Sequence, residues 1–155
     1  MYEYNCKIVR VVDGDTVDVD IDLGFGIWIQ NERIRVHGID TPESRTRDLV
    51  EKKFGLLAKK MVEKWLPVGS KQVLITMKDK AGKYGRTLGK FKIFDGSDDR
   101  QTTLNDWMIA NNYAVEYHGQ SKKEIANGHL QNYKEILEEV ELDQTELGAY
   151  ISSRS

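Results

Sequence analysis

Arginine and carboxylate side chains come together in the segment Arg-Val-His-Gly-Ile-Asp-Thr-Pro-Glu, residues 35–43. The apolar residues before Asp40 are typical of a strand, which carries Arg35 in its middle and ends at the aspartate. Pro42 has a fixed φ and favours extended backbone at the residue before it, so we expect Asp40 and Glu43 on a stiff corner. An arginine beside two carboxylates suits a site for a metal ion and a phosphate better than it suits core packing.

A second acidic corner precedes this one, in the segment Val-Asp-Gly-Asp-Thr-Val, residues 12–17. Asp-Gly between two apolar segments indicates a tight turn, because glycine accepts the positive φ that such turns require. If the two corners lie side by side, Asp15 and Asp40 form an oxygen pocket that a carbonyl and water could complete, as Ca²⁺ prefers. Either segment alone is more often a plain turn or the start of a helix.

A third segment, Lys-Tyr-Gly-Arg at residues 83–86, lies between two apolar runs and predicts a hairpin corner that presents Tyr84 and Arg86. The motifs Asp-Gly-Asp-Thr, Arg-x₄-Asp-Thr-Pro-Glu and Lys-Tyr-Gly-Arg together resemble the staphylococcal nuclease family, also called thermonucleases. They occur in the family's order and at similar intervals, and the resemblance extends over roughly residues 4–140. It implies a staphylococcal-nuclease-like domain with an OB-type barrel.

The resemblance also implies an activity and the residues that perform it. The expected enzyme is a calcium-dependent nuclease that hydrolyses DNA and RNA with little sequence specificity and leaves 3′-phosphate ends. The implied metal ligands are Asp15, Asp40 and the Thr41 carbonyl, with Mg²⁺ or Mn²⁺ as less favoured ions. The implied catalytic residues are the general base Glu43 and the phosphate clamps Arg35 and Arg86. The implied substrate-binding residues are Lys83, Tyr84 and Tyr117.

These residue types suit phosphodiester hydrolysis. Arginine stays protonated and binds phosphate oxygens in bidentate fashion, which lysine cannot do. Carboxylates with a hard cation can hold and polarise the phosphate. The tyrosine that would stack near the base is either Tyr113 or Tyr117, and Tyr117 is favoured because Gly119 follows it in an expected loop. A core or rim position for Tyr117 is an equal alternative.

Two other function classes compete with the enzyme. The first is a catalytically inactive nuclease-like domain that serves as a nucleic-acid-binding scaffold. Such a copy would be expected to lose the clamps or the base, whereas Arg35, Glu43 and Arg86 are all present. The second is a plain OB-type single-strand binder, which predicts aromatic residues on strand faces and no cluster of carboxylates. Both are therefore less favoured than the nuclease.

The composition is that of an ordinary soluble domain, with 39% hydrophobic and 31% charged residues and a net charge of −2. Any attraction for nucleic acid must therefore come from local clusters of Lys and Arg. Cys6 is the only cysteine, so no intrachain disulfide can form, and we expect it to be buried. Without a signal peptide at its start, the chain is expected to be cytoplasmic, intracellular in a phage-infected host, or the mature form of a secreted enzyme. DNA and RNA are the expected partners of a monomer that does not contact membranes.

The elements that position the site follow from the hydrophobic pattern. We predict an α+β fold, mainly β, with a five-stranded OB barrel and three supporting helices in one domain over residues 1–155. Val17, Val19 and Ile21 alternate with Asp18, Asp20 and Asp22, which predicts a strand with one solvated face. The predicted strands are 6–12, 16–21, 27–39, 73–77 and 87–94. The predicted helices are 48–66, a short one capped by Thr102 or Thr103, and 130–140, followed by a frayed tail after about residue 146.

Overall fold

The computed structural model describes residues 2–81, 86–94 and 101–154. The chain forms a sheet of order β3-β2-β1-β5-β6-β7, and a parallel pairing of β3 with β6 closes five of these strands into a barrel. The remaining strands, β4 and β8, form a separate antiparallel pair. The strands are β1 (Tyr2–Asp13), β2 (Thr16–Asp22), β3 (Trp28–Val36), β4 (Ile39–Asp40), β5 (Lys71–Ala81), β6 (Thr87–Phe94), β7 (Gln101–Thr103) and β8 (Val115–Glu116).

Four α-helices and a short 3₁₀ helix accompany the barrel in the described residues. Each α-helix starts at a residue whose side chain accepts a hydrogen bond from a backbone N–H in the first turn, which satisfies a donor that the helix leaves free. The helices are α1 (Leu49–Trp65), α2 (Leu104–Ala110), α3 (Lys122–Glu135), the 3₁₀ helix Leu137–Glu139 and α4 (Gln144–Ser152). Their caps are Asp48, Thr103, Ser121 and Asp143. The predicted α+β fold with an OB-type barrel is confirmed.

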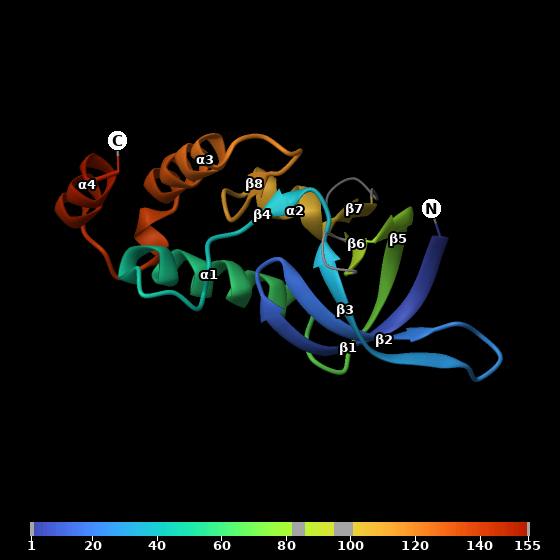
Figure 1. The fold of residues 1–155 in the computed structure, drawn as a ribbon. Coiled ribbons are helices and arrows are strands. Elements are labelled where there is room, and N and C mark those ends of the chain that lie inside the picture. Colours follow the sequence, from blue (N-terminus) through green and yellow to red (C-terminus); the bar gives the residue numbers. More distant parts are fainter. Residues whose placement is uncertain (1, 82–85, 95–100, 155) are drawn as a thin grey trace.

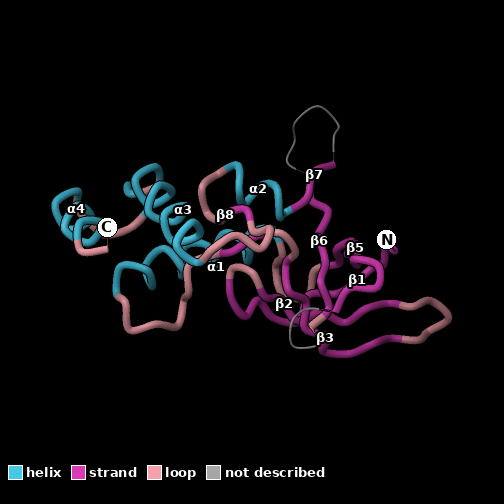
Figure 2. The backbone as a smooth tube through the Cα atoms, turned by 45° about the horizontal axis from the view of Figure 1, so that its top comes forward, coloured by secondary structure: helices cyan, strands magenta, loops and turns pink. Residues whose placement is uncertain are grey.

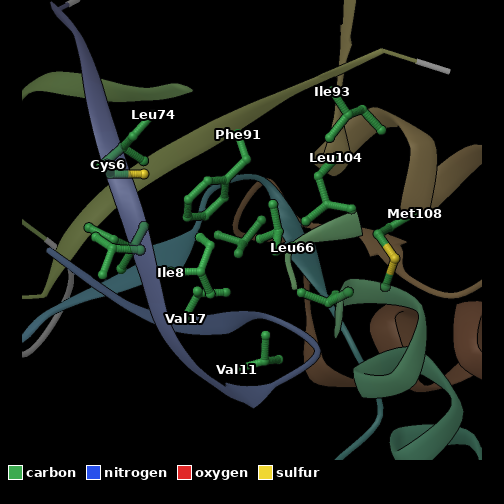
Figure 3. Packing of buried hydrophobic residues seen from close by; sticks show 14 of the residues in the cluster. Cys6, Ile8, Val11, Val17, Leu66, Leu74, Phe91, Ile93, Leu104 and Met108 are labelled. Carbon is green, nitrogen blue, oxygen red and sulfur yellow. The ribbon is translucent and has the colours of Figure 1, made fainter. Parts of the chain in front are cut away.

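Two hydrophobic clusters hold these elements together. The larger one fills the barrel and extends to α1 and α2, and Figure 3 shows Phe91 among Ile8, Leu66 and Leu104. Cys6 belongs to this cluster and is 2% exposed, and burial raises the pKa of its thiol to about 12. The smaller cluster joins α1, α3 and α4. It contains Phe54, Leu57, Tyr133, Ile136 and Leu147.

The β2–β3 hairpin extends away from the helices in both Figure 1 and Figure 2. Its pattern of alternate burial is confirmed for Val17, Val19 and Ile21, but the prediction that Asp18 is solvated is wrong. Asp18 is 3% exposed and accepts hydrogen bonds from Arg10 and Arg33 on the two neighbouring strands. The register sets these three residues side by side, so the arginines replace water around the carboxylate.

The C-terminal part of the chain differs from the prediction. The third helix begins at Lys122, eight residues before the predicted start at residue 130, because Ser121 caps it. It ends at Glu135, before the predicted end at residue 140. The tail after residue 146 is not frayed, since α4 covers Gln144–Ser152 and buries Leu147. Among the described residues, none of the helices is long and apolar enough to cross a membrane.

Candidate active site

Two acidic corners lie next to each other at one rim of the barrel. The first is the β1–β2 turn that carries Asp15, and the second follows β4 and carries Thr41. The Thr41 N–H donates a hydrogen bond to Asp15 Oδ2 at 3.5 Å, which joins two residues that are 26 positions apart. The corners predicted from separate motifs therefore lie side by side.

Asp15 is a largely buried carboxylate at the centre of this rim. Burial raises its pKa, and the negative charges of Asp13 and Asp40 raise the pKa further. The Arg35 guanidinium acts in the opposite direction, with Nη2 at 3.6 Å from Asp15 Oδ2. The Thr16 hydroxyl also donates to Asp15 Oδ1 at 3.1 Å. One arginine and one hydroxyl do not offset the burial and the neighbouring anions, so the carboxylate lacks compensating positive charge.

Arg35 is held in place by main-chain oxygens. Nη1 donates to the carbonyl of Val36 and Nη2 to that of Ile39, both at 2.8 Å, and the side chain is 15% exposed. These bonds span the turn between β3 and β4 and fix the plane of the guanidinium. A fixed fork of N–H donors loses little entropy when it binds a phosphate.

Glu43 stands on the corner that Pro42 stiffens. Its backbone N–H donates to Glu51 Oε2 at 3.1 Å, so the first turn of α1 holds the segment from one side. On the other side, the Glu43 carbonyl packs against Gly55, where an added Cβ would lie only 2.2 Å from the Glu43 oxygen. The glycine in the middle of α1 therefore allows the helix to approach the loop that carries the proposed base.

The Glu43 carboxyl is exposed on one side and faces other carboxylates on the other. Partial burial and the charges of Asp13, Asp15, Glu51 and Asp40 raise its pKa to about 7. A carboxyl that titrates near neutral pH can take a proton from water as the water attacks. This electrostatic setting is typical of a general base.

Asp40 ends β4, which pairs with β8 through Asp40 and Val115. Its Oδ2 lies 2.7 Å from His129 Nε2, a residue of α3 that the sequence motifs do not include. Asp13, whose Oδ1 accepts a hydrogen bond from the Gly14 N–H at 2.9 Å, is a second such residue. Asp13 could have been noticed in the motif Asp-Gly-Asp, whereas nothing in the sequence connects His129 to the site.

The donors at this rim fit a hard cation. Asp15 and Asp40 supply carboxylate oxygens, and the Thr41 Oγ1 is buried without a hydrogen-bond partner in the described part of the chain. Burial raises the pKa of Asp15, and the charges of Asp13 and Asp40 add to the rise, so a cation at the rim would favour the ionised carboxylate. No group of three or more His, Cys, Asp or Glu side chains is placed to hold a metal within residues 2–81, 86–94 and 101–154. A cation here would thus rely on two carboxylates, a Thr41 oxygen and water, as Ca²⁺ and Mg²⁺ do.

The predicted second clamp, Arg86, lies next to the strand pairing that closes the barrel. Arg86 is half-buried and directly precedes β6, which pairs with β3 so that Thr87 lies beside Ile34 and Leu88 beside Arg35. The backbone of Arg86 therefore lies beside β3, two residues before the partner of Arg35. Lys83 and Tyr84 lie outside the described residues.

The two candidate tyrosines occupy different environments. Tyr113 donates its hydroxyl to Glu139 at 2.6 Å and stacks on Trp107, so it is a structural residue. Tyr117 is 46% exposed, and its N–H donates to the Gly38 carbonyl at 2.8 Å in the turn beside Arg35. Tyr117 is thus the tyrosine that remains available at the rim.

A cleft of about 940 Å³ opens next to the two corners. Asp40, Thr41, Glu43 and Tyr117 line one part of it, and α3 and α4 line the rest. Several of these lining residues from α3 and the C-terminal segment were not predicted from sequence, and they add positive charge beside the acidic corners. They include Lys122, Lys123 and Arg154.

The far wall of the cleft is closed by a contact between α4 and α1. Tyr150 Oη donates to Asp48 Oδ2 at 2.6 Å, and Arg154 Nη2 donates to the same oxygen at 2.8 Å. The Arg154 guanidinium also lies 3.6 Å from the centroid of the Tyr150 ring. Asp48 caps α1 with its other oxygen, so the C-terminal helix is attached to the helix that supports Glu43.

Comparison with known proteins agrees with this arrangement. The family described as staphylococcal nuclease homologue matches residues 33–146. An uncharacterized protein of Methanocaldococcus jannaschii is 32% identical, with 74% of this chain and 59% of that protein covered. A thermonuclease of Staphylococcus intermedius is 35% identical, with 52% of this chain and 44% of that protein covered. A thermonuclease of Staphylococcus hyicus is 27% identical, with 85% of this chain and 74% of that protein covered.

The chain spans about two fifths to three fifths of the length of most relatives that it matches. It covers 59% of the archaeal protein, for example, and 41% of the protein ParB of Escherichia coli. The family match, in contrast, covers most of the chain, from the middle of β3 to the start of α4. It includes Arg35, Asp40 and Glu43 on the second corner and Arg86 before β6. The chain belongs to the staphylococcal nuclease homologue family.

Proposed function

We propose that this protein is a metal-dependent nuclease that hydrolyses phosphodiester bonds of DNA and RNA with little sequence specificity. The observation that carries the proposal is the convergence of Asp15, Arg35, Asp40 and Glu43 on one rim, from a turn and a corner far apart in the sequence. Membership of the family supports the same activity. The cleft beside the rim is large enough for a nucleotide and its flanking phosphates.

Asp15, Asp40 and Thr41 would hold Ca²⁺, and a bound Ca²⁺ would polarise the phosphate and neutralise charge as it develops. Glu43 would accept a proton from the attacking water, since its pKa of about 7 makes it a base of suitable strength. Arg35 and Arg86 would bind the non-bridging oxygens as their negative charge increases. Attack with departure of the 5′-oxygen would leave a 3′-phosphate end.

Substrate contacts beyond the scissile phosphate follow from the lining of the cleft. Tyr117 offers a ring for a base to stack on, and such stacking contributes about 1–3 kcal/mol per base. Lys122 and Lys123, at the start of α3, can attract neighbouring phosphates despite the net charge of −2. Backbone charge and stacking do not distinguish one base sequence from another, so little sequence specificity is expected.

The decisive experiment measures cleavage of a fluorescent single-stranded DNA in EGTA and after addition of Ca²⁺, Mg²⁺ or Mn²⁺. Glu43→Gln should lower the single-turnover rate by about 10²- to 10⁴-fold while the DNA still binds. Glu63→Gln, an exposed glutamate on α1, is the matched control and should cleave like the wild type. Chemical analysis of the products should show 3′-phosphate ends.

The alternative is a nucleic-acid-binding domain without activity. It would bind the DNA in the same assay, but none of the three ions would produce cleavage. In that case the raised pKa of Glu43 and the bracing of Arg35 would have no catalytic purpose. Cleavage that persists undiminished in Glu43→Gln would instead keep the nuclease and remove Glu43 from its mechanism.

A further inference from the structure

His129 of α3 contacts the proposed calcium ligand Asp40 in the lining of the cleft. Its Nε2 lies 2.7 Å from Asp40 Oδ2, and the histidine is only 9% exposed. The Asp40 side chain is 31% exposed and lines the cleft. The histidine thus occupies one carboxylate oxygen, and the second oxygen can serve a cation on the open side.

The environment of the ring selects its tautomer. Nδ1 of His129 is buried and has no hydrogen-bond partner within the described ranges. A proton on that nitrogen would leave a buried N–H without an acceptor, which costs about 1–3 kcal/mol. With its proton on Nε2 the ring avoids this cost and donates a hydrogen bond to Asp40 Oδ2.

The backbone of α3 is placed so that this contact can form. Gly128 precedes His129, and a Cβ on Gly128 would lie 3.0 Å from both methyl carbons of Val115. Val115 is the residue of β8 that pairs with Asp40 in β4. The missing side chain at position 128 therefore lets α3 approach the strand pair that ends in Asp40.

An aromatic stack fixes the imidazole ring laterally. Tyr133, one turn further along α3, stacks on Phe54 of α1 with a centroid separation of 3.9 Å and an interplanar angle of 8°. The His129 ring lies 6.3 Å from the Tyr133 ring at an angle of 26°. Packing from α1 and α3 thus limits the orientations from which His129 can donate to Asp40.

We propose that His129 is a positioning residue that orients the Asp40 carboxylate for binding of a divalent cation. The inference rests on the proposed function, because it assumes that Asp40 is a metal ligand. Residues that hydrogen-bond to a metal ligand orient it, and their loss typically weakens metal affinity about 10- to 100-fold. A contact that served only to attach α3 to β4 would instead affect stability and leave the affinity of the folded protein unchanged.

The test compares Ca²⁺ binding by calorimetry in the wild type and in two variants of the full chain. His129→Leu removes the donor at similar size, whereas His129→Gln retains an N–H the same number of bonds from the backbone as Nε2. His118→Leu is the matched control, since this histidine is exposed on the loop after β8. The unfolding midpoint of each variant is measured in EGTA, so that loss of fold is separated from loss of affinity.

We expect His129→Leu to bind Ca²⁺ about 10- to 100-fold more weakly, and His129→Gln to recover most of the affinity. The control should bind like the wild type. Unchanged affinity in folded His129→Leu, or an equal loss in the leucine and glutamine variants, would overturn the role of His129. If the wild type itself binds no divalent cation, the metal site of the proposed function fails together with this inference.

Discussion

Gly55→Ala should have the opposite effect on this protein from the one that helix propensity predicts. Alanine in place of glycine in a helix interior usually stabilises by about 1 kcal/mol. At position 55, however, the new Cβ would lie 2.2 Å from the Glu43 carbonyl oxygen and 2.4 Å from its carbon, whereas Cβ contacts under 3.0 Å are essentially never seen. The neighbours are backbone atoms, so the loop that carries Glu43 has to move.

The Glu43 carbonyl oxygen would have to move by about 0.8 Å or more, which is the difference between 2.2 Å and the lower limit of 3.0 Å for Cβ contacts. A displacement of about 1 Å at a catalytic group can lower the rate about 10²-fold, and overpacking costs about 1–3 kcal/mol. We therefore expect Gly55→Ala to lose about 10²-fold in single-turnover cleavage and to gain no stability in urea unfolding. Gly148→Ala in α4 is the matched control, because a Cβ there meets nothing within 4 Å. It should stabilise the protein by up to about 1 kcal/mol with normal cleavage. A stabilised Gly55→Ala variant with wild-type turnover would refute this account of the Glu43 loop.

Three further changes test the electrostatics of the molecule. Because the folded protein raises the pKa of Glu43 to about 7 from an unfolded value near 4.3, the metal-free fold should lose stability as pH rises between these values. Glu43→Gln should therefore raise the unfolding free energy at pH 8 more than at pH 5, and an equal effect at both pH values would contradict the shift. Hydrogen bonds from Arg33 and Arg10 lower the pKa of Asp18 in the folded protein. The contribution of the ionised Asp18 to the free energy of unfolding is therefore complete above the unfolded pKa near 3.9, and it is lost as pH falls through the lower folded pKa. Asp18→Asn should cost about 1–3 kcal/mol at pH 7 and much less at pH 2 in urea unfolding, and a constant difference would exclude the ion pairs. Arg35→Lys should reduce single-turnover cleavage although the charge is kept, because lysine cannot reproduce two donor groups in one plane; wild-type turnover in this variant would show that charge alone suffices.

The parts of the site that the sequence predicts are those in which a short motif stands at the end of a strand. Asp15 lies in the turn between β1 and β2, and Glu43 lies on the corner after β4, so local turn chemistry fixes where their side chains begin. The order of strands and the first helix could be predicted for the same reason, because periodicity and caps are local signals. Thr103, for instance, caps α2 as the sequence predicted.

Contacts between distant segments could not be predicted in this way. His129 is 89 residues from Asp40, and its partner depends on how closely α3 packs on β8. Asp18 appeared solvated because strict alternation places it opposite Val17 and Val19, but the two arginines come from the neighbouring strands. The prediction of a frayed tail after about residue 146 is wrong for the same reason, because its contacts are with distant segments. Leu147, Tyr150 and their partners on other helices make α4 stable.

The charges of the rim indicate why the proposed nuclease would need a cation. Burial and the charges of neighbouring carboxylates raise the pKa values of Asp15 and Glu43, and Arg35 is the cation that the structure pairs with Asp15. Without further positive charge, this cluster repels the phosphate that Arg35 is placed to bind. A divalent ion between Asp15 and Asp40 would reverse the sign of the local field and lower the pKa of the neighbouring carboxyls. Binding of the ion would thus attract the substrate, ionise Glu43 so that it can act as a base, and relieve repulsion among the carboxylates of the fold. Ion binding and the ionisation of the proposed base would therefore be coupled through these carboxylates.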